Sequence, residues 1–226
     1  MSLSTSTLVV FCKRPKKGQG KQRLAQSIGI DAAYSIAQLL VLHTATLVKQ
    51  WPGPVVIALT DISDAEWSQQ TFGPLKIAIQ PEGGLGERLL GVETELRTQE
   101  HTDLLFIGTD APALTLENLK YAALKLQNYD VAFIPTYDGG VSLMASRTPW
   151  PDLTQVRWSN FSTFTDLLKL CKAHNYSHYT ASPNYDIDYI EDLFRLYRDK
   201  KTCDAFSSFA HWYQNCEPKL VNSKPT

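Results

Sequence analysis

The sequence has few residues that could cross-link it. Its four cysteines, Cys12, Cys171, Cys203 and Cys216, are scattered over 226 residues. No pair of cysteines, or of cysteine and histidine, has the spacing of zinc ligands. A disulfide-stapled miniprotein is therefore excluded, and unpaired cysteines are typical of the cytoplasm, which is the location we expect.

Long hydrophobic runs are also absent. The longest apolar stretch near the N-terminus covers residues 8–12, and the later stretch 38–48 is interrupted by His43 and Thr44. A membrane-spanning helix needs about 20 apolar residues. The polar, uncharged first residues do not resemble the basic start of a signal peptide. We expect neither a transmembrane helix nor a signal peptide.

Net charge is nearly absent as well. The chain has 22 Lys+Arg and 23 Asp+Glu, a formal net charge of -1, so it lacks the basic surplus of a nucleic-acid or membrane-surface binder. The charge is uneven, however, because residues 13–23 hold six basic residues and no acidic one. Taking those six charges from the total leaves -7 on the other 215 residues. This basic loop fits either a small anionic ligand or a solvated charge run.

Short apolar runs alternate with helical patterns along the chain. This alternation predicts a three-layer α/β/α fold with a mostly parallel sheet, in a single domain over residues 1–226. The expected strands are 7–12, 55–59, 75–80, 103–108, 130–135 and a short strand 141–145 that could be antiparallel. The expected helices are 31–49, 64–70, 87–98, 115–126, 162–174, 190–200 and 204–213.

Four loops rich in glycine, proline and charge follow the expected strands. They are the basic loop and the segments 83–86, 109–112 and 138–140. Ligands of open α/β sheets bind outside the carboxyl ends of the strands, so we expect these loops to form one rim around a ligand.

The basic loop carries no complete nucleotide motif. A Walker P-loop fails because Pro15 stands at the first glycine position and Gln22 replaces Ser/Thr, and a dinucleotide-binding motif fails because Arg23 replaces its third glycine. A glycine- and lysine-rich loop can still present cations and backbone N–H groups to a phosphate. We expect phosphate contacts from Lys21 or Arg23, with a solvated loop as the alternative.

Three aspartates could hold a divalent cation, which prefers hard oxygen ligands. Asp110 follows an apolar strand, where an Asx turn or a helix cap is the competing interpretation. Asp186 and Asp188 share one face of an extended segment. Ser142 lacks the Gly-x-Ser-x-Gly pattern, so hydrolase chemistry has no support.

Five motifs in order resemble one known family. They are Phe-x-Lys-x-Pro-x-x-Gly-x-x-Lys-x-Arg-Leu from residue 11, Gln-x-x-x-x-Leu-Gly-Glu-Arg from 80, Gly-Thr-Asp-x-Pro-x-Leu from 108, Asp-x-x-x-x-Pro-x-x-Asp-Gly-Gly from 130 and Asp-x-Asp-x-x-Glu-Asp-Leu from 186. Together they resemble the DUF2064 family, whose members are often called glycosyltransferase-like. That family is similar to the molybdenum-cofactor and phospholactate guanylyltransferases and shares their nucleotide-diphospho-sugar transferase (GT-A, Rossmann-like) fold.

The resemblance implies a site. Nucleotide and phosphate contacts would come from Lys13, Gly18, Lys21, Arg23, Gln80, Gly86 and Arg88, and the metal ligands would be Asp110 and Asp188. Asp110, Lys21 and Asp138 would be the catalytic residues, with 138–140 as the acceptor-side wall. The nucleotide-binding half would cover about 7–110, the acceptor-side half about 111–200, and a C-terminal helix about 203–214. The chain departs from the family at Val141, where an aromatic residue is usual, and at Tyr189, where threonine is common.

The resemblance also implies a reaction class. The first hypothesis is a Mg²⁺- or Mn²⁺-dependent, glycosyltransferase-like enzyme with a nucleotide-diphospho-sugar donor and a small-molecule acceptor. The second is a nucleotidyltransferase that joins an NTP to a small phosphorylated acceptor and releases pyrophosphate. The third is a non-catalytic nucleotide-binding protein on the same fold. No nucleic acid or membrane is expected as a partner.

Overall fold

A computed structural model of the chain describes residues 6–221, with side chains described as far as residue 216. The described chain forms two compact units. The sheet unit comprises residues up to Arg14, Leu47–Gly108 and Leu114–Asn184. The helical unit comprises Pro15–Thr46, Thr109–Ala113 and the residues from Tyr185 onward. Each unit is described by itself below.

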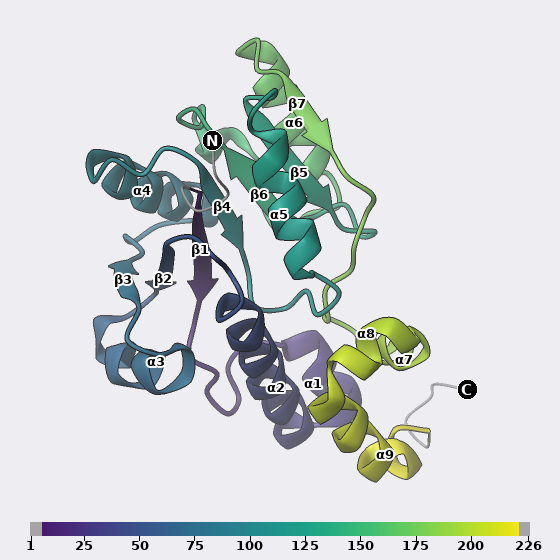
Figure 1. Cartoon of the computed structure of the whole chain (residues 1–226). Coiled ribbons are helices and arrows are strands. Elements are labelled where there is room, and N and C mark those ends of the chain that lie inside the picture. Colours follow the sequence, from purple (N-terminus) through teal and green to yellow (C-terminus); the bar gives the residue numbers. More distant parts are fainter. Residues whose placement is uncertain (1–5, 222–226) are drawn as a thin grey trace. The chain divides into compact units, whose positions relative to one another are not determined.

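The sheet unit is built on a seven-stranded sheet (Figure 1). Its strands are β1 (Thr7–Cys12), β2 (Val55–Leu59), β3 (Lys76–Ile79), β4 (Leu104–Ile107), β5 (Val131–Pro135), β6 (Val141–Ser146) and β7 (His178–Thr180). They lie in the order β3-β2-β1-β4-β6-β5-β7, and only the pairs that β6 makes with β4 and β5 are antiparallel. The predicted α/β class, the mostly parallel sheet and the antiparallel strand after residue 140 are confirmed.

The central strands are buried on both faces, as is typical of parallel sheets. Leu8, Val9 and Val10 on β1 are all 0% exposed. One apolar core contains Val9 and Phe106 together with residues of α4 (Leu85–Thr98) and α6 (Thr163–Ala173). The other helices of this unit are α3 (Ala65–Phe72), α5 (Leu116–Lys125) and the 3₁₀ turns η2 (Ile62–Asp64) and η3 (Leu153–Gln155).

The pairing directions place the carboxyl ends of five strands at one edge of the sheet. Because β1, β2, β3, β4 and β5 all run the same way, their carboxyl ends lie at a common edge. From the ends of β1 and β4, which are neighbours, the chain passes into the helical unit. The segments 80–86 and 136–140 follow β3 and β5 at the same edge.

The helical unit has an apolar core of its own. Its helices are α1 (Gln22–Ile28), most of α2 (Ile30–Val48), α7 (Ile190–Arg198), α8 (Lys200–Ala205) and α9 (Ser207–Val221). Leu24 on α1, Ile36 on α2, Leu193 on α7 and Phe209 on α9 belong to one buried cluster, together with Ile187. Apolar residues from all parts of this discontinuous unit therefore hold it together.

Helix α2 is, among residues 6–221, the one helix that is long and apolar enough to cross a membrane by length and composition. The core helix of a soluble protein meets the same criteria. Here Ala33, Ile36 and Leu40 on one face of α2 are buried in the core of the helical unit. This packing accounts for the apolar residues on that face.

The sequence patterns missed two elements. Helix α1 begins right after Lys21, which adopts a left-handed conformation (φ 46°) and makes no side-chain cap hydrogen bond, so the usual signal for a helix start is missing. Strand β7 has only three residues, too few for a visible alternation. The predicted last helix, 204–213, is instead two helices, α8 and α9, that meet at Phe206.

Candidate functional site

Lys21 is held in an unusual backbone conformation within the basic loop. Gly18 and Gly20 have φ angles of 76° and 73°, and Lys21 follows with a φ angle of 46°. A non-glycine residue in this region costs roughly 1–2 kcal/mol. The carbonyl of Lys21 accepts the N–H of Ala25 at 2.8 Å, which starts α1. The sequence thus fixes the Lys21 backbone at the point where loop becomes helix.

Asp110 and Asp188 lie on neighbouring segments of the helical unit. The N–H of Ile187 donates to the carbonyl of Asp110 at 3.0 Å and joins the two segments. Ile187 itself is 0% exposed in the core of this unit, which anchors that pairing. Two aspartates from distant parts of the chain are therefore placed side by side by one backbone hydrogen bond and one buried side chain.

Asp192 holds Asp188 from the other side. One carboxylate oxygen of Asp192 accepts the N–H of Asp188 at 3.0 Å and the N–H of Tyr189 at 2.8 Å. Both N–H groups directly precede α7, and an acid in the first turn also complements the helix dipole. Asp192 is thus a positioning residue for Asp188.

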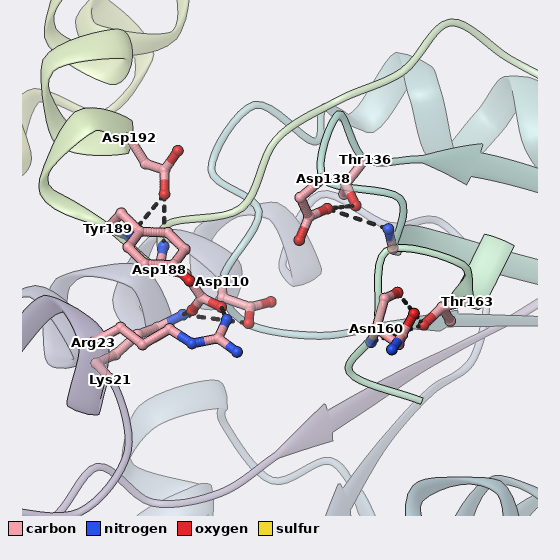
Figure 2. A network of polar contacts seen from close by, with 11 residues as sticks. Lys21, Arg23, Asp110, Thr136, Asp138, Asn160, Thr163, Asp188, Tyr189 and Asp192 are labelled. Atoms are coloured by element: carbon pink, nitrogen blue, oxygen red, sulfur yellow. Dashed lines mark hydrogen bonds and ion pairs between the residues drawn. The ribbon is translucent and has the colours of Figure 1, made fainter. Parts of the chain in front are cut away.

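The ammonium group of Lys21 joins the two aspartates (Figure 2). Its Nζ lies 2.9 Å from Oδ1 of Asp188 and 3.4 Å from Oδ2 of Asp110. Arg23 adds a second cation, with Nη1 3.5 Å from the other carboxylate oxygen of Asp188. The Lys21 side chain is 13% exposed, whereas those of Asp110 and Asp188 are 46% and 33% exposed. The cluster places two cations and two carboxylates together at the surface of one unit.

The charge on Lys21 is secured by its neighbours. Burial by itself lowers the pKa of the ammonium group, but the carboxylates of Asp110 and Asp188 outweigh it and raise the pKa above its ordinary value of 10.5. Lys21 is therefore a permanent cation at physiological pH.

Tyr189 adds an aromatic face to the same cluster. The guanidinium carbon of Arg23 lies 5.4 Å from the centre of the Tyr189 ring, within cation–π range. The ring is on the residue directly after Asp188, at the position where the family resemblance has threonine. The substitution therefore gives Arg23 a stacking partner beside the carboxylate that it contacts.

The paired carboxylates suit a hard divalent cation. Carboxylate oxygens are the ligands that Mg²⁺ and Mn²⁺ prefer, and Mg²⁺ is usually held by one or two carboxylates together with substrate phosphates and water. Asp110 has one carboxylate oxygen outside the Lys21 ion pair, and both aspartates are partly exposed. The described residues contain no group of three or more His, Cys, Asp or Glu side chains suited to a metal. Asp110 and Asp188 are the paired carboxylates of this unit that could hold such a cation.

Other predicted site residues belong to the sheet unit and are placed by packing there. Gln80 is 7% exposed, and its side-chain amide donates to the carbonyl of Ala58 at 2.7 Å. Its Oε1 accepts from Arg88 at 3.4 Å. A Cβ atom on Gly86 would lie 2.4 Å from the carbonyl oxygen of Leu153, which explains why only glycine fits. These contacts account for the three residues locally, and their nucleotide contacts stay a prediction.

Lys13 and Gly18 flank the start of the basic loop. Lys13 is exposed directly after β1, in the sheet unit. Gly18 is in the helical unit, where its carbonyl accepts from the side chain of Gln22 at 2.8 Å. A Cβ atom on Gly18 would meet no atom within 4 Å, so its positive φ angle alone favours glycine.

Asp138 lies in a tight turn of the sheet unit (Figure 2). Its Oδ1 accepts from the hydroxyl of Thr136 and, at 3.2 Å, from the N–H of Gly140. Gly139 (φ 91°) is packed on the segment that precedes α6, since its carbonyl accepts the N–H of Phe164 at 2.9 Å. The turn fixes one oxygen of the Asp138 carboxylate, and these hydrogen bonds do not involve the other oxygen of this exposed residue.

The segment packed on this turn was not singled out from the sequence. The side chain of Asn160 accepts from the N–H of Ser162 at 3.0 Å, and the hydroxyl of Thr163 donates to the Asn160 carbonyl at 2.7 Å. Between them, Phe161 is 81% exposed. The Asn-x-Ser-Thr sequence before a helix was the available signal, because these residue types form such local turns.

Three solved structures have the same fold. A protein from Desulfovibrio desulfuricans G20, provisionally named a nucleotide-diphospho-sugar transferase, is 22% identical with a TM-score of 0.89, over 99% of this chain and 100% of its own. A CMP:2-keto-3-deoxy-manno-octonic acid synthetase in complex with CTP is 13% identical with a TM-score of 0.53, over 85% and 97% of the two chains. The manganese complex of Rv0371c from Mycobacterium tuberculosis H37Rv is 16% identical with a TM-score of 0.51, over 85% and 97%. The fold is therefore that of nucleotide-diphospho-sugar transferases and nucleotidyltransferases.

Sequence comparison gives the family. No curated protein matches the chain. The model of the family described as "Uncharacterized protein conserved in bacteria (DUF2064)" matches residues 43–160, more than half of the chain. The matched part contains Asp110 and Asp138, whereas Lys21 and Asp188 lie on either side of it. The predicted resemblance is confirmed: this chain belongs to the DUF2064 family.

Proposed function

We propose that this protein is a divalent-metal-dependent transferase that acts on a nucleotide-activated substrate. The observation that carries the proposal is the ion-pair cluster, in which Lys21 lies between Asp110 and Asp188 with Arg23 beside them. Carboxylates for a metal and cations for phosphates are what transfer from a nucleotide phosphate requires. Membership of a fold shared by such transferases agrees with it.

Each residue of the cluster has a separate task in this proposal. Asp110 and Asp188 would hold Mg²⁺ or Mn²⁺, and the bound cation would neutralise negative charge on the phosphate oxygens. Lys21 and Arg23 bind phosphate oxygens and stabilise the charge that develops on the leaving group. Positioning and electrostatics carry most of such a reaction, so the protein needs no nucleophile.

The remaining predicted residues complete the nucleotide and acceptor sites. We assign Lys13, Gly18, Gln80, Gly86 and Arg88 to nucleotide binding. The nucleotide-binding half would then cover about 7–110 and the acceptor-side half about 111–200, within one catalytic domain.

Glycosyl transfer from a nucleotide-diphospho-sugar is the first candidate reaction. The likeness to the Desulfovibrio protein over the full length of both chains favours it. An inverting transfer needs a base for the acceptor hydroxyl. We assign this role to Asp138, because its turn fixes one carboxylate oxygen and presents the other on an exposed side chain.

Nucleotidyl transfer is the second candidate. It would join an NTP to a small phosphorylated acceptor and release pyrophosphate. Two observations favour it: the likeness to a synthetase in complex with CTP, and the six cations of the basic loop, since such a reaction has two sets of phosphates to neutralise.

Ligand-induced stabilisation tests the proposal. The chain is heated with Mn²⁺ and, in separate samples, CTP, GTP, UTP, ATP, UDP-glucose, GDP-mannose and TDP-glucose. A ligand at 100 times its Kd stabilises the folded state by about 2.7 kcal/mol, so at least one of these ligands is expected to raise the melting temperature by several degrees. Asp188→Asn should remove the metal-dependent part of the rise. No shift with any ligand would contradict the proposal.

Product analysis separates the candidate reactions. Release of UDP, GDP or TDP from a nucleotide sugar identifies glycosyl transfer, whereas release of pyrophosphate from an NTP with sugar phosphates identifies nucleotidyl transfer. Binding without either product in the presence of a broad acceptor panel would favour the third alternative, a non-catalytic nucleotide-binding protein.

A further inference from the structure

The carboxylates of the cluster already have cationic partners within the protein. Lys21 lies between Asp110 and Asp188, Arg23 contacts Asp188, and the carboxylate of Asp186 also acts electrostatically on Lys21. Each oxygen of Asp188 is in contact with a cation, Oδ1 with Lys21 and Oδ2 with Arg23. A divalent cation that entered by itself would therefore compete with the ammonium group of Lys21 and the guanidinium group of Arg23 for the same oxygens.

The ammonium group of Lys21 can also move to another anionic partner. Its side chain rises from a backbone in the left-handed region, directly after Gly20, and a Cβ atom on Gly20 would meet no atom within 4 Å. The loop before it is exposed from Lys16 to Gly20. The Lys21 side chain is only 13% exposed, but a lysine has four rotatable side-chain bonds and a compact charge, so its ammonium group can turn from one neighbouring anion to another.

We propose that Lys21 exchanges partners when ligands bind. In the ligand-free protein its ammonium group takes the place of a metal between Asp110 and Asp188. When a nucleotide and a divalent cation bind together, the two carboxylates hold the cation and Lys21 moves onto the phosphate oxygens. The inference rests on the proposed function and extends it. Metal and nucleotide each bind weakly alone, and each raises the affinity of the protein for the other.

The coupling follows from charge and from linkage. A metal that arrives with a phosphate gives Lys21 a new anionic partner, whereas a metal that arrives alone gives it none. If nucleotide raises the affinity for metal by some factor, metal must raise the affinity for nucleotide by the same factor. Lys21 is the residue whose two alternative partners generate that factor.

Binding of Mn²⁺ alone to the full chain tests the exchange. The free Mn²⁺ signal is measured by electron paramagnetic resonance for the parent, Lys21→Met and Lys17→Met. Lys17→Met is the matched control: it removes one charge from the same loop, and its partner is Asp31 at the surface. Lys21→Met is expected to bind Mn²⁺ at least tenfold more tightly than the parent, and Lys17→Met within twofold of it. Circular dichroism checks that each variant folds. If Lys21→Met does not fold, Lys21→Gln replaces it, because glutamine removes the charge but keeps a hydrogen-bond donor.

The outcomes separate this inference from the function on which it rests. If Lys21→Met binds Mn²⁺ no more tightly than the parent, while Asp188→Asn abolishes Mn²⁺ binding, the partner exchange is overturned and the metal site stands. If neither the parent nor the Lys21 variants bind Mn²⁺, and no nucleotide with Mn²⁺ stabilises the parent, both the metal site and the exchange are overturned.

Discussion

Gly139→Ala should weaken the protein through a contact that the structure defines closely. A Cβ atom at position 139 would lie 1.9 Å from the carbonyl oxygen of Phe161, which is backbone and cannot rotate away. The φ angle of 91° adds a conformational penalty for any other residue. The turn that holds Asp138 and the segment before α6 would therefore have to separate.

The magnitude follows from two contributions. The positive φ angle costs alanine about 1–2 kcal/mol. Separation of the two segments breaks the hydrogen bond from the N–H of Phe164 to Gly139 at 2.9 Å, which costs about 1 kcal/mol, and exposes part of their contact. We expect a total of about 3 kcal/mol, or a melting temperature lower by about 10 °C for a chain of this size.

Gly73→Ala is the matched control. Gly73 has nearly the same φ angle, 95°, but a Cβ atom there would meet no atom within 4 Å. The free energy of unfolding of Gly73→Ala should therefore fall only by the conformational cost of the positive φ angle, about 1–2 kcal/mol. Thermal unfolding followed by circular dichroism compares the two variants. Equal losses of stability would show that the Asp138 turn is not seated on the Phe161 backbone, and would refute the reasoning.

Four further predictions concern Glu93, Cys216 and Asp166. Glu93→Ala should cost about 3 kcal/mol in urea unfolding, because it removes the buried carboxylate that pairs with Arg97 and accepts the Trp150 N–H. Arg97 keeps hydrogen bonds to three other acceptors, which limits the loss. A loss below about 1 kcal/mol would contradict this. Burial also raises the pKa of Glu93 above its ordinary value of 4.5, so the folded state binds more protons than the unfolded state around this pH. The contribution of Glu93 to stability should therefore fall as the pH rises from about 4.5 through the raised pKa. Glu93→Gln should remove this pH dependence. A thiol reagent should label Cys216 fast in the native protein and the other cysteines, which are buried, only after denaturation; rapid labelling of more than one thiol would contradict the described core. The guanidinium of Arg157 lowers the pKa of Asp166 to about 2, so its carboxylate signal in a nuclear magnetic resonance titration should not change between pH 7 and pH 4.

The sequence predicted the fold best where the chain has local signals. Strands β1 and β2 match the predicted ranges. Helix α5 starts where it was predicted, because Thr115 and Asn118 form a reciprocal cap in which the N–H of each donates to the side chain of the other, at 3.0 and 3.2 Å. Helix α1 was missed because a lysine in a left-handed conformation starts it in place of a capping side chain. Strand β7 was missed because its place depends on pairing with β5 and not on its own three residues.

The candidate site was predictable in its members but not in its contacts. Motifs gave Lys21, Arg23, Asp110 and Asp188, and the structure brings these four together. That Lys21 contacts both carboxylates depends on the pairing of Ile187 with Asp110, and no local pattern encodes a hydrogen bond between such distant segments.

The contact between the Asp138 turn and the segment before α6 could not be predicted from the sequence either. Phe161 contacts Gly139 through its backbone, and a backbone contact leaves no trace in residue type at Phe161 itself. The glycine carried the signal, since a close approach and a positive φ angle both demand it.

The most direct test of the account is the position of Mn²⁺ in a crystal of the protein grown with the nucleotide that stabilises it best. Anomalous scattering locates the ion independently of the model. The account predicts one peak in contact with carboxylate oxygens of Asp110 and Asp188 and with phosphate oxygens, and the Lys21 ammonium group on the phosphate. A bound nucleotide with the Mn²⁺ peak away from both aspartates, or with Lys21 still paired to them, would contradict it.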